Sequence, residues 1–294
     1  MSYHFKYTLE PYKGPNQKHT CPSCNRKKSF VRYIDTQTRQ YHSDPNVGRC
    51  DREVKCKYHK KPGGNMHYKP KTKDQNDLVF NFVDGKYLEY SMQEGRRNFF
   101  VEFLYQKYPK DSVNKAVENY NIGSTVKKPG STIFWQLDEN GNIRTGKIMM
   151  YNPETGKRIK SENHNHISWV HKFISQNENF SLRQCLFGLH LAIGNDLPLA
   201  IVESEKTAVI GSIELPNYIW LATGSKNGLN KNKFHSIRYR DITFFPDLGC
   251  MDNWKKDAKK LNLKSSPTWF KLLEDNQNEP GYFQGMDIAD YFLM

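Results

Sequence analysis

The fold of this chain is decided by residues 197–208, which have the sequence LPLAIVESEKTA. The apolar run that begins at Pro198 is rich in β-branched residues and predicts a buried strand of a parallel sheet. The spacing of Ala208, Val209 and Ile210 predicts that a helix follows. Glu203 therefore lies where strand gives way to helix, at the sheet edge where open α/β folds bind ligands. Packing gives little reason for a carboxylate at the end of an apolar strand.

A second strand of the same kind, ITFFP at residues 242–246, ends in Asp247. If the two strands are neighbours, Glu203 and Asp247 face one point at the sheet edge. Paired carboxylates suit a hard divalent cation such as Mg²⁺, which usually takes one or two carboxylates together with substrate phosphates. The sequence therefore predicts a site for Mg²⁺ or Mn²⁺ at this edge.

Four motifs follow one another along the second half of the chain. They are VESEKTA at 202–208, ATGS at 222–225, FPD at 245–247 and GMDIAD at 285–290. In this order they resemble the motifs of Toprim domains, the catalytic domains of bacterial-type primases, topoisomerases and some nucleases. The resemblance implies that Glu203 acts as a general acid or base or helps to hold a metal, and that Asp247 binds Mg²⁺. It further implies that Asp287 and Asp290 supply ligands for a second ion.

Two positions depart from the Toprim pattern. Gly249 stands where the second aspartate of the usual Asp-x-Asp pair is expected, and Ser204 replaces the glycine that usually follows the glutamate. Asp252 lies a few residues further on and is a candidate to compensate. Because losing a carboxylate weakens a two-metal site, one-metal chemistry and a degenerate site that only binds both stay open as hypotheses. A helix N-terminal carboxylate favoured by the helix dipole is the plain structural alternative for Glu203.

The composition indicates a protein that meets a polyanion. The length of 294 residues predicts two or three compact units. Its formal net charge is +13 and its pI is near 9.3, which favours nucleic acid as a partner over a basic surface without one. No apolar run approaches a membrane span, and the N-terminus lacks the apolar core of a signal peptide. We therefore expect a cytoplasmic protein with no membrane partner, in which paired cysteines indicate metal before disulfides.

Four early cysteines predict a zinc ribbon. Two residues separate Cys21 from Cys24, so both thiolates can point at one ion, and Cys50 and Cys56 complete a tetrahedral structural Zn²⁺ site. The five residues between Cys50 and Cys56 exceed the usual spacing of about two to four. This wider loop leaves room for another ligand in place of a cysteine: His59 or, less readily, His42 or His67.

The middle of the chain predicts helices and a β-hairpin. Residues 98–105 and 113–120 have helical apolar spacing, a stripe over 182–193 predicts a further helix, and a DENGN turn at 138–142 predicts the hairpin. The hairpin resembles one that carries basic residues toward nucleotide or template in primases. The candidate phosphate or nucleic-acid ligands are Arg144, Lys147, Lys157 and Arg158, with Lys226 in the loop after the second parallel strand. Solvated surface charge is the alternative for each of them.

These observations predict three domains in an α/β chain. A zinc ribbon with a basic linker occupies residues 1–75, a helical and β-hairpin subdomain occupies 76–194, and a Toprim-like, mostly parallel sheet covered by helices occupies 195–294. This order resembles the primase-like proteins of bacterial phages, plasmids and other mobile elements.

The function that the resemblance implies is Mg²⁺-dependent, primase-like nucleotidyl transfer on single-stranded DNA, with nucleoside triphosphates as substrates. The chain lacks a Gly-x-x-x-x-Gly-Lys-Ser/Thr loop, so a separate helicase is an expected partner. The alternatives are a Toprim nuclease and a catalytically degenerate protein that only binds nucleic acid.

Overall fold

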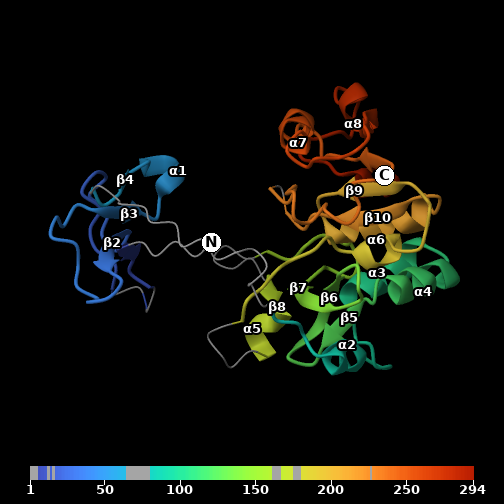
Figure 1. The fold of residues 1–294 in the computed structure, drawn as a ribbon, viewed down its shortest axis with the longest axis horizontal. Helices are drawn as coiled ribbons and strands as arrows, with labels where there is room; N and C mark the ends of the chain where they lie inside the picture. Colours follow the sequence, from blue (N-terminus) through green and yellow to red (C-terminus); the bar gives the residue numbers. More distant parts are fainter. Residues whose placement is uncertain are drawn as a thin grey trace. The chain divides into compact units, whose positions relative to one another are not determined.

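The computed structural model describes residues 6–11, 14, 17–63, 80–160, 167–174, 180–225 and 227–294. The chain divides into two compact units, Met1–Leu78 and Val79–Met294, which Figure 1 shows coloured along the sequence. No helix in the described ranges is both long and apolar enough to cross a membrane.

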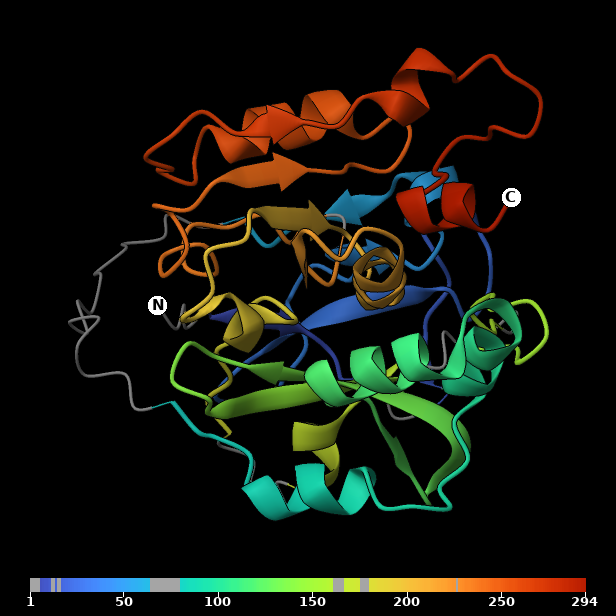
Figure 2. The ribbon, with the colours of Figure 1, turned by 90° about the vertical axis from the view of Figure 1, so that its right-hand side faces the viewer.

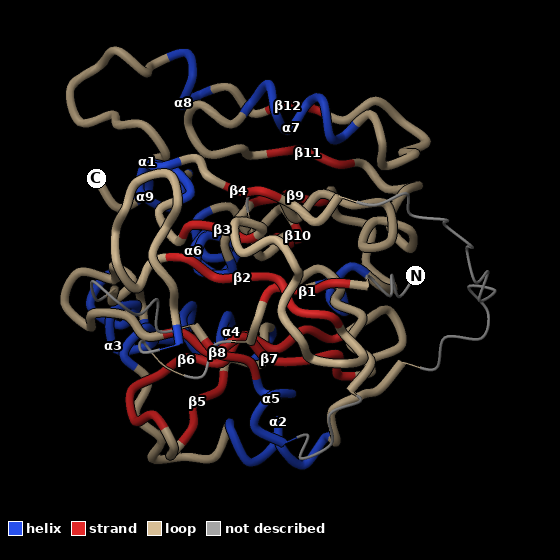
Figure 3. Tube along the Cα trace, turned by 90° about the vertical axis from the view of Figure 1, so that its left-hand side faces the viewer, coloured by secondary structure: helices blue, strands red, loops and turns tan. Residues whose placement is uncertain are grey.

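The first unit is built on a small antiparallel sheet with strand order β1-β2-β3-β4. Its strands are β1 (Tyr7–Leu9), β2 (Phe30–Asp35), β3 (Gly48–Cys50) and β4 (His59–Lys60), and the helix α1 (Glu53–Cys56) is a single turn. Figure 3 shows these short red strands joined by long tan loops. The apolar core is very small, with Phe30 packed against the cysteines. A module of this size needs a further stabilising constraint, such as a structural metal, in order to fold.

The second unit begins with an antiparallel sheet of order β5-β6-β7-β8. Its strands are β5 (Gly123–Thr125), β6 (Lys128–Leu137), β7 (Ile143–Met149) and β8 (Ser168–Trp169). The surrounding helices are α2 (Gly85–Ser91), α3 (Phe99–Lys107), α4 (Lys110–Asn119) and α5 (Val170–Ile174). β6 and β7 form the predicted hairpin around residues 138–142. Figure 2 shows α3 and α4, in green, against these strands.

A parallel sheet of order β10-β9-β11-β12 completes the second unit. Its strands are β9 (Leu199–Val202), β10 (Ile219–Ala222), β11 (Ile242–Phe244) and β12 (Thr268–Trp269). The remaining helices are η3 (Leu189–Ala192), α6 (Glu205–Glu214), α7 (Met251–Ala258), α8 (Leu272–Asp275) and α9 (Ile288–Phe292). β9 lies between β10 and β11, so the two carboxylate-bearing strands are neighbours, as expected for a Toprim-like sheet.

Both faces of the parallel sheet are buried. One face of β9 carries Ala200 and Val202 into a core shared with Phe100 and Leu104 of α3, and the other carries Leu199 and Ile201 toward α7. A central parallel strand covered on both faces has to be apolar throughout, which is the pattern that the sequence shows. The predicted α/β fold class, with a zinc ribbon, a helical and hairpin region and a Toprim-like sheet, is confirmed.

One predicted element is wrong. The apolar stripe over residues 182–193 does not form a continuous helix: residues 182–186 have no regular structure, Phe187 pairs with Ala222 as an isolated bridge, and only η3 is helical. Phe187 and Leu189 are buried in the cores on either side of the parallel sheet, so the apolar residues of this stretch serve tertiary packing and do not form one face of a helix.

Candidate active site and metal centres

The four early cysteines meet at one point in the first unit. Their Sγ atoms all lie within 4.8 Å of one another, with Cys21 and Cys56 at 3.8 Å and Cys24 and Cys50 at 4.0 Å. Tetrahedral Zn²⁺ with Zn–S bonds of about 2.3 Å requires sulfur atoms about 3.8 Å apart, so these thiols fit a structural zinc ion. A backbone hydrogen bond from Arg26 is the main influence that lowers the pKa of Cys24, to about 7, which favours its thiolate form.

The long spacing of the second cysteine pair is taken up by α1. In this single helical turn the amide of Cys56 donates to the carbonyl of Arg52 at 2.6 Å. The turn shortens the distance along the chain and brings Cys56 to the other three cysteines. His59 is 3.0 Å from the hydroxyl of Tyr33 through its Nε2 atom and stands outside the cysteine cluster. His67 lies outside the described residues.

Glu203 and Asp247 follow β9 and β11 at the same edge of the parallel sheet. Burial is the main cause that raises the pKa of Asp247 to about 8, and the negative charges of Asp287, Glu203 and Asp290 raise it further, while Lys206 opposes them. The negative charges of carboxylates from separate motifs therefore act on one partly buried carboxyl group, that of Asp247. Two of them are enough for Mg²⁺, which completes its shell with water and phosphate oxygens.

The carboxylates do not form a closed metal cage like that of the cysteines. Within the described ranges, the four cysteines are the only group of three or more potential ligands close enough to share an ion. Asp287 caps α9 by accepting from the amide of Asp290 at 2.9 Å, and it accepts from the hydroxyl of Thr207 at 2.7 Å. Asp290 completes this capping box and lies 3.5 Å from the ammonium of Lys206. Both aspartates thus anchor α9 to α6.

Gly249 is fixed by its conformation and by a neighbour. Its φ of +83° lies in the left-handed region, and a Cβ atom there would meet the side-chain amide of Gln284 at 1.8 Å. Gln284 also donates to the carbonyl of Leu248 at 2.9 Å. Asp252 lies on the first turn of α7, where its charge helps to raise the pKa of Glu274. The side chain of Gln284 therefore occupies the space next to Gly249.

A buried ion pair underlies the loop after β10. Lys147 of β7 donates to Glu205 Oε2 and to the carbonyl of Gly224, both at 2.9 Å. Lys233 donates to the carbonyl of Thr223 at 2.8 Å, and the amide of Gly224 donates to the carbonyl of Glu203 at 2.9 Å. Two lysines from different parts of the unit thus hold consecutive carbonyls of the loop that borders Glu203.

The basic residues proposed to bind phosphate lie in different surroundings. Lys147 is buried and its ammonium contacts protein atoms. Lys157 is exposed, and Arg158 pairs with Tyr151 beyond the end of β7. Burial raises the pKa of Tyr151 well above its usual value, the charges of Glu205 and Asp287 raise it further, and the charge of Arg158 opposes them. Lys226 lies outside the described residues.

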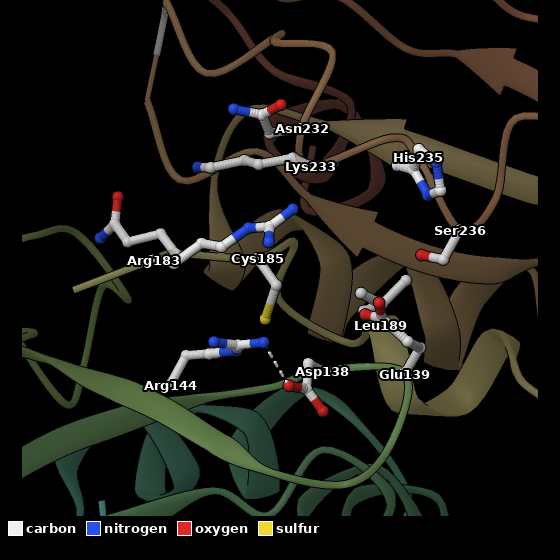
Figure 4. A pocket seen from close by; sticks show the side chains of 11 residues that line it. Asp138, Glu139, Arg144, Arg183, Cys185, Leu189, Asn232, Lys233, His235 and Ser236 are labelled. Carbon is white, nitrogen blue, oxygen red and sulfur yellow. Dashed lines mark ion pairs between the residues drawn. The ribbon is translucent and has the colours of Figure 1, made fainter. Parts of the chain in front are cut away.

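Arg144 lines a pocket at the turn of the hairpin β6–β7. The pocket also includes Arg183, Cys185 and Lys233, as Figure 4 shows. Arg144 forms a 2.8 Å ion pair with the buried Asp138, and burial raises the pKa of the Cys185 thiol to about 12. Arg183 and Lys233 belong to no motif, so nothing in the sequence marks them as pocket residues, whereas Glu205 lies within residues 197–208.

Two family models match the chain. The model described as Domain of unknown function (DUF6371) matches residues 98–248, just over half of the chain. The chain belongs to this family. The DUF6371 region spans α3 to β11 and so includes the hairpin, Glu203 and Asp247. A zinc β-ribbon finger model matches residues 5–73, where the cysteine cluster lies. Among curated proteins, none matches the chain.

The chain is similar to solved structures of primases. The primase fragment of the bacteriophage T7 primase-helicase protein is 13% identical, with 86% of this chain and 87% of that chain covered at a TM-score of 0.37. The Aquifex aeolicus primase is 12% identical, with 63% of this chain and 46% of that chain covered at a TM-score of 0.36. The E. coli primase catalytic core is 11% identical, with 60% of this chain and 65% of that chain covered at a TM-score of 0.39. The predicted zinc ribbon is confirmed by the family model and by the cysteine cluster. At these identities and TM-scores, the similarity to primases carries no argument about the activity of this chain.

We expect bound zinc to depend on the four-cysteine cluster alone. Replacing Cys24 with serine removes one of the four thiolates and should lower the zinc content measured by mass spectrometry, with loss of protease resistance in the first unit. Cys185→Ser is the matched control, because this buried thiol lies outside the cluster. Zinc loss in the control, or full zinc retention in Cys24→Ser, contradicts the assignment.

Restoring the missing aspartate should destabilise the protein. Gly249→Asp introduces a side chain at positive φ against Gln284, which should cost about 2 kcal/mol in the free energy of unfolding measured with urea. Gly95→Asp is the matched control, because Gly95 has a φ of +77° and no atom within 4 Å of its Cβ position. Equal costs for both variants would show that Gln284 does not exclude the aspartate, whereas Gln284→Ala should recover part of the loss.

The acidic edge should make stability depend on pH when Mg²⁺ is absent. Because the pKa of Asp247 is raised from 3.8 to about 8 in the folded state, the folded protein holds a proton that the unfolded chain releases. The stabilising contribution is complete below pH 3.8 and is lost as pH rises through about 8. Urea unfolding across this range should show the wild type losing stability relative to Asp247→Asn. A constant difference between the two proteins contradicts the raised pKa.

Proposed function

We propose that the chain is a Mg²⁺-dependent enzyme of nucleic-acid metabolism whose reaction is primase-like nucleotidyl transfer on single-stranded DNA. The observation that carries the proposal is the convergence of acidic groups on Asp247 at the carboxyl edge of the parallel sheet. Several negative charges around a partly buried carboxyl favour a bound divalent cation, and hard oxygen donors suit Mg²⁺ or Mn²⁺. Nucleoside triphosphates are the proposed second substrate.

In this proposal Glu203 and Asp247 hold the cation. When bound there, Mg²⁺ would neutralise phosphate charge and orient the reacting oxygens. A role for Glu203 as general acid or base is the alternative to its role as a metal ligand in this proposal. Lys147 and Lys233 hold the neighbouring loop through its carbonyls. Asp287 and Asp290 contribute negative charge to the site while their oxygens contact α6 and α9. The site is therefore proposed to work with one firmly held metal.

The zinc ribbon is proposed to bind the single strand. Tyr41 is 43% exposed, and the guanidinium carbon of Arg32 lies 4.5 Å from the centroid of its ring. An exposed aromatic ring beside a cation can stack on an unpaired base and contact its phosphate. A separate helicase and a role in the replication of phages or other mobile elements belong to the same proposal.

A second candidate function is nucleic-acid binding without catalysis. It is favoured by Gly249, since Gln284 occupies the space beside this glycine, where the Toprim pattern has a second aspartate. In this alternative the Toprim-like sheet acts as a scaffold, and the ribbon with the basic surface supplies the affinity.

The proposal is tested by incubating the protein with single-stranded DNA, labelled nucleoside triphosphates and Mg²⁺ or Mn²⁺. New oligonucleotides should appear with the wild type and fall by at least about a hundredfold with Glu203→Gln and Asp247→Asn, because both remove a metal ligand. Lys115→Gln, an exposed change on α4, is the control and should leave the yield unchanged.

Strand cleavage that depends on the same two residues would replace the primase assignment with a nuclease. If neither product forms while salt-sensitive DNA binding survives in both variants, the enzyme proposal fails and the binding function stands.

A further inference from the structure

The pocket at the hairpin turn brings together three separate segments of the second unit. Asp138 and Arg144 come from the turn and the start of β7, Arg183 and Cys185 from the segment before η3, and Lys233 from the loop after β10 (Figure 4). Such convergence of long cationic side chains from distant parts of the sequence is unfavourable unless their charge is used.

The charges in the pocket are not balanced within it. Asp138 is buried and is already engaged by the amides of Asn140 and Asn142, both at 2.9 Å, as well as by Arg144. The Nη1 atom of Arg144 is buried without an acceptor. A guanidinium donor in this position costs free energy until an acceptor reaches it.

Aromatic rings support both arginines. The guanidinium carbon of Arg144 lies 4.5 Å from the ring centroid of Phe82, and that of Arg183 lies 5.3 Å from the ring centroid of Phe80. The segment that carries these rings is itself fixed, because the amide of Val83 donates to the carbonyl of Ile143 at 2.8 Å. Stacked guanidinium groups lose little freedom when they bind an anion, since their orientation is already set.

Lys233 supplies the third cation. It is buried, and burial lowers its pKa, so an anion nearby would stabilise its charged form. Glu139 also lines the pocket but is exposed, whereas the carboxylate of Asp138 is occupied. The three cations therefore exceed the available negative charge.

We infer that this pocket binds a phosphate group through Arg144, Arg183 and Lys233. Two guanidinium groups and an ammonium that approach from different segments match the several acceptor oxygens and the charge of a phosphate. The group belongs either to a nucleotide or to a nucleic-acid strand. The inference goes beyond the proposed function, because phosphate binding here requires neither the acidic edge nor catalysis.

The test is calorimetric titration of the full chain with pyrophosphate in buffer without Mg²⁺. Arg183→Gln and Arg144→Gln should each weaken binding by about tenfold or more, as expected for losing a charge-assisted hydrogen bond. Arg97→Gln is the matched control, because Arg97 does not line the pocket. Arg97 likewise stacks on a ring, with its guanidinium carbon 4.7 Å from the ring centroid of Phe99, and forms an ion pair with Glu102 at 2.8 Å. Arg183 is exposed, so its replacement should leave folding intact even if Arg144→Gln does not.

Titration with ATP and with a labelled oligothymidylate then distinguishes the source of the phosphate. If Arg183→Gln weakens the binding of ATP alone, the pocket is a nucleotide site. If it weakens the binding of the oligonucleotide alone, the pocket is a site for a nucleic-acid strand. Glu203→Gln should retain pyrophosphate binding, so failure of catalysis leaves this result untouched. No pyrophosphate binding by the wild type, or equal weakening in Arg97→Gln, overturns the inference.

Discussion

An ion pair buried between the two sheets of the second unit connects the parts that matter for function. Lys147 belongs to the antiparallel sheet and Glu205 to the helix that follows β9, and the two charges are 2.9 Å apart. Removing one partner of a buried pair generally costs about 3–5 kcal/mol, because the other charge is left in a medium that solvates it poorly. Lys147 also holds the carbonyl of Gly224, whose amide contacts Glu203, so one ammonium group links both sheets to the acidic edge.

The loop after β10 has an acidic neighbour at one end and a basic neighbour at the other. Gly224 lies beside Glu203, and Lys233 contributes to the pocket at the hairpin turn. Gly224 has a φ of +82°, and a Cβ atom on it would lie 3.1 Å from Glu205 Oε1, so both conformation and space favour glycine there. The loop therefore connects the acidic edge proposed to hold a cation with the basic pocket proposed to bind phosphate.

The sequence predicted the features that depend on burial and on fixed spacing. Strands β9 and β11 were identified because both faces of each are covered, and the cysteine cluster because four thiolates at short spacing suit zinc. It did not predict that Lys147 would be buried or that Gln284 would occupy the space beside Gly249. Both depend on side chains that are distant in sequence and meet only after the sheets and loops have packed. The same reason explains the stripe over 182–193, whose apolar residues serve tertiary contacts.

The proposal that Glu203 and Asp247 share one divalent cation is tested most directly by a crystal structure of the protein soaked in Mn²⁺, with diffraction recorded at the manganese absorption edge. We expect an anomalous peak coordinated by the carboxylates of Glu203 and Asp247, with Gln284 still beside Gly249. The shared-cation proposal would be contradicted if no peak lay at the carboxyl edge of the sheet under conditions in which the protein acts on DNA. It would also be contradicted by a peak coordinated by Asp287 and Asp290 alone.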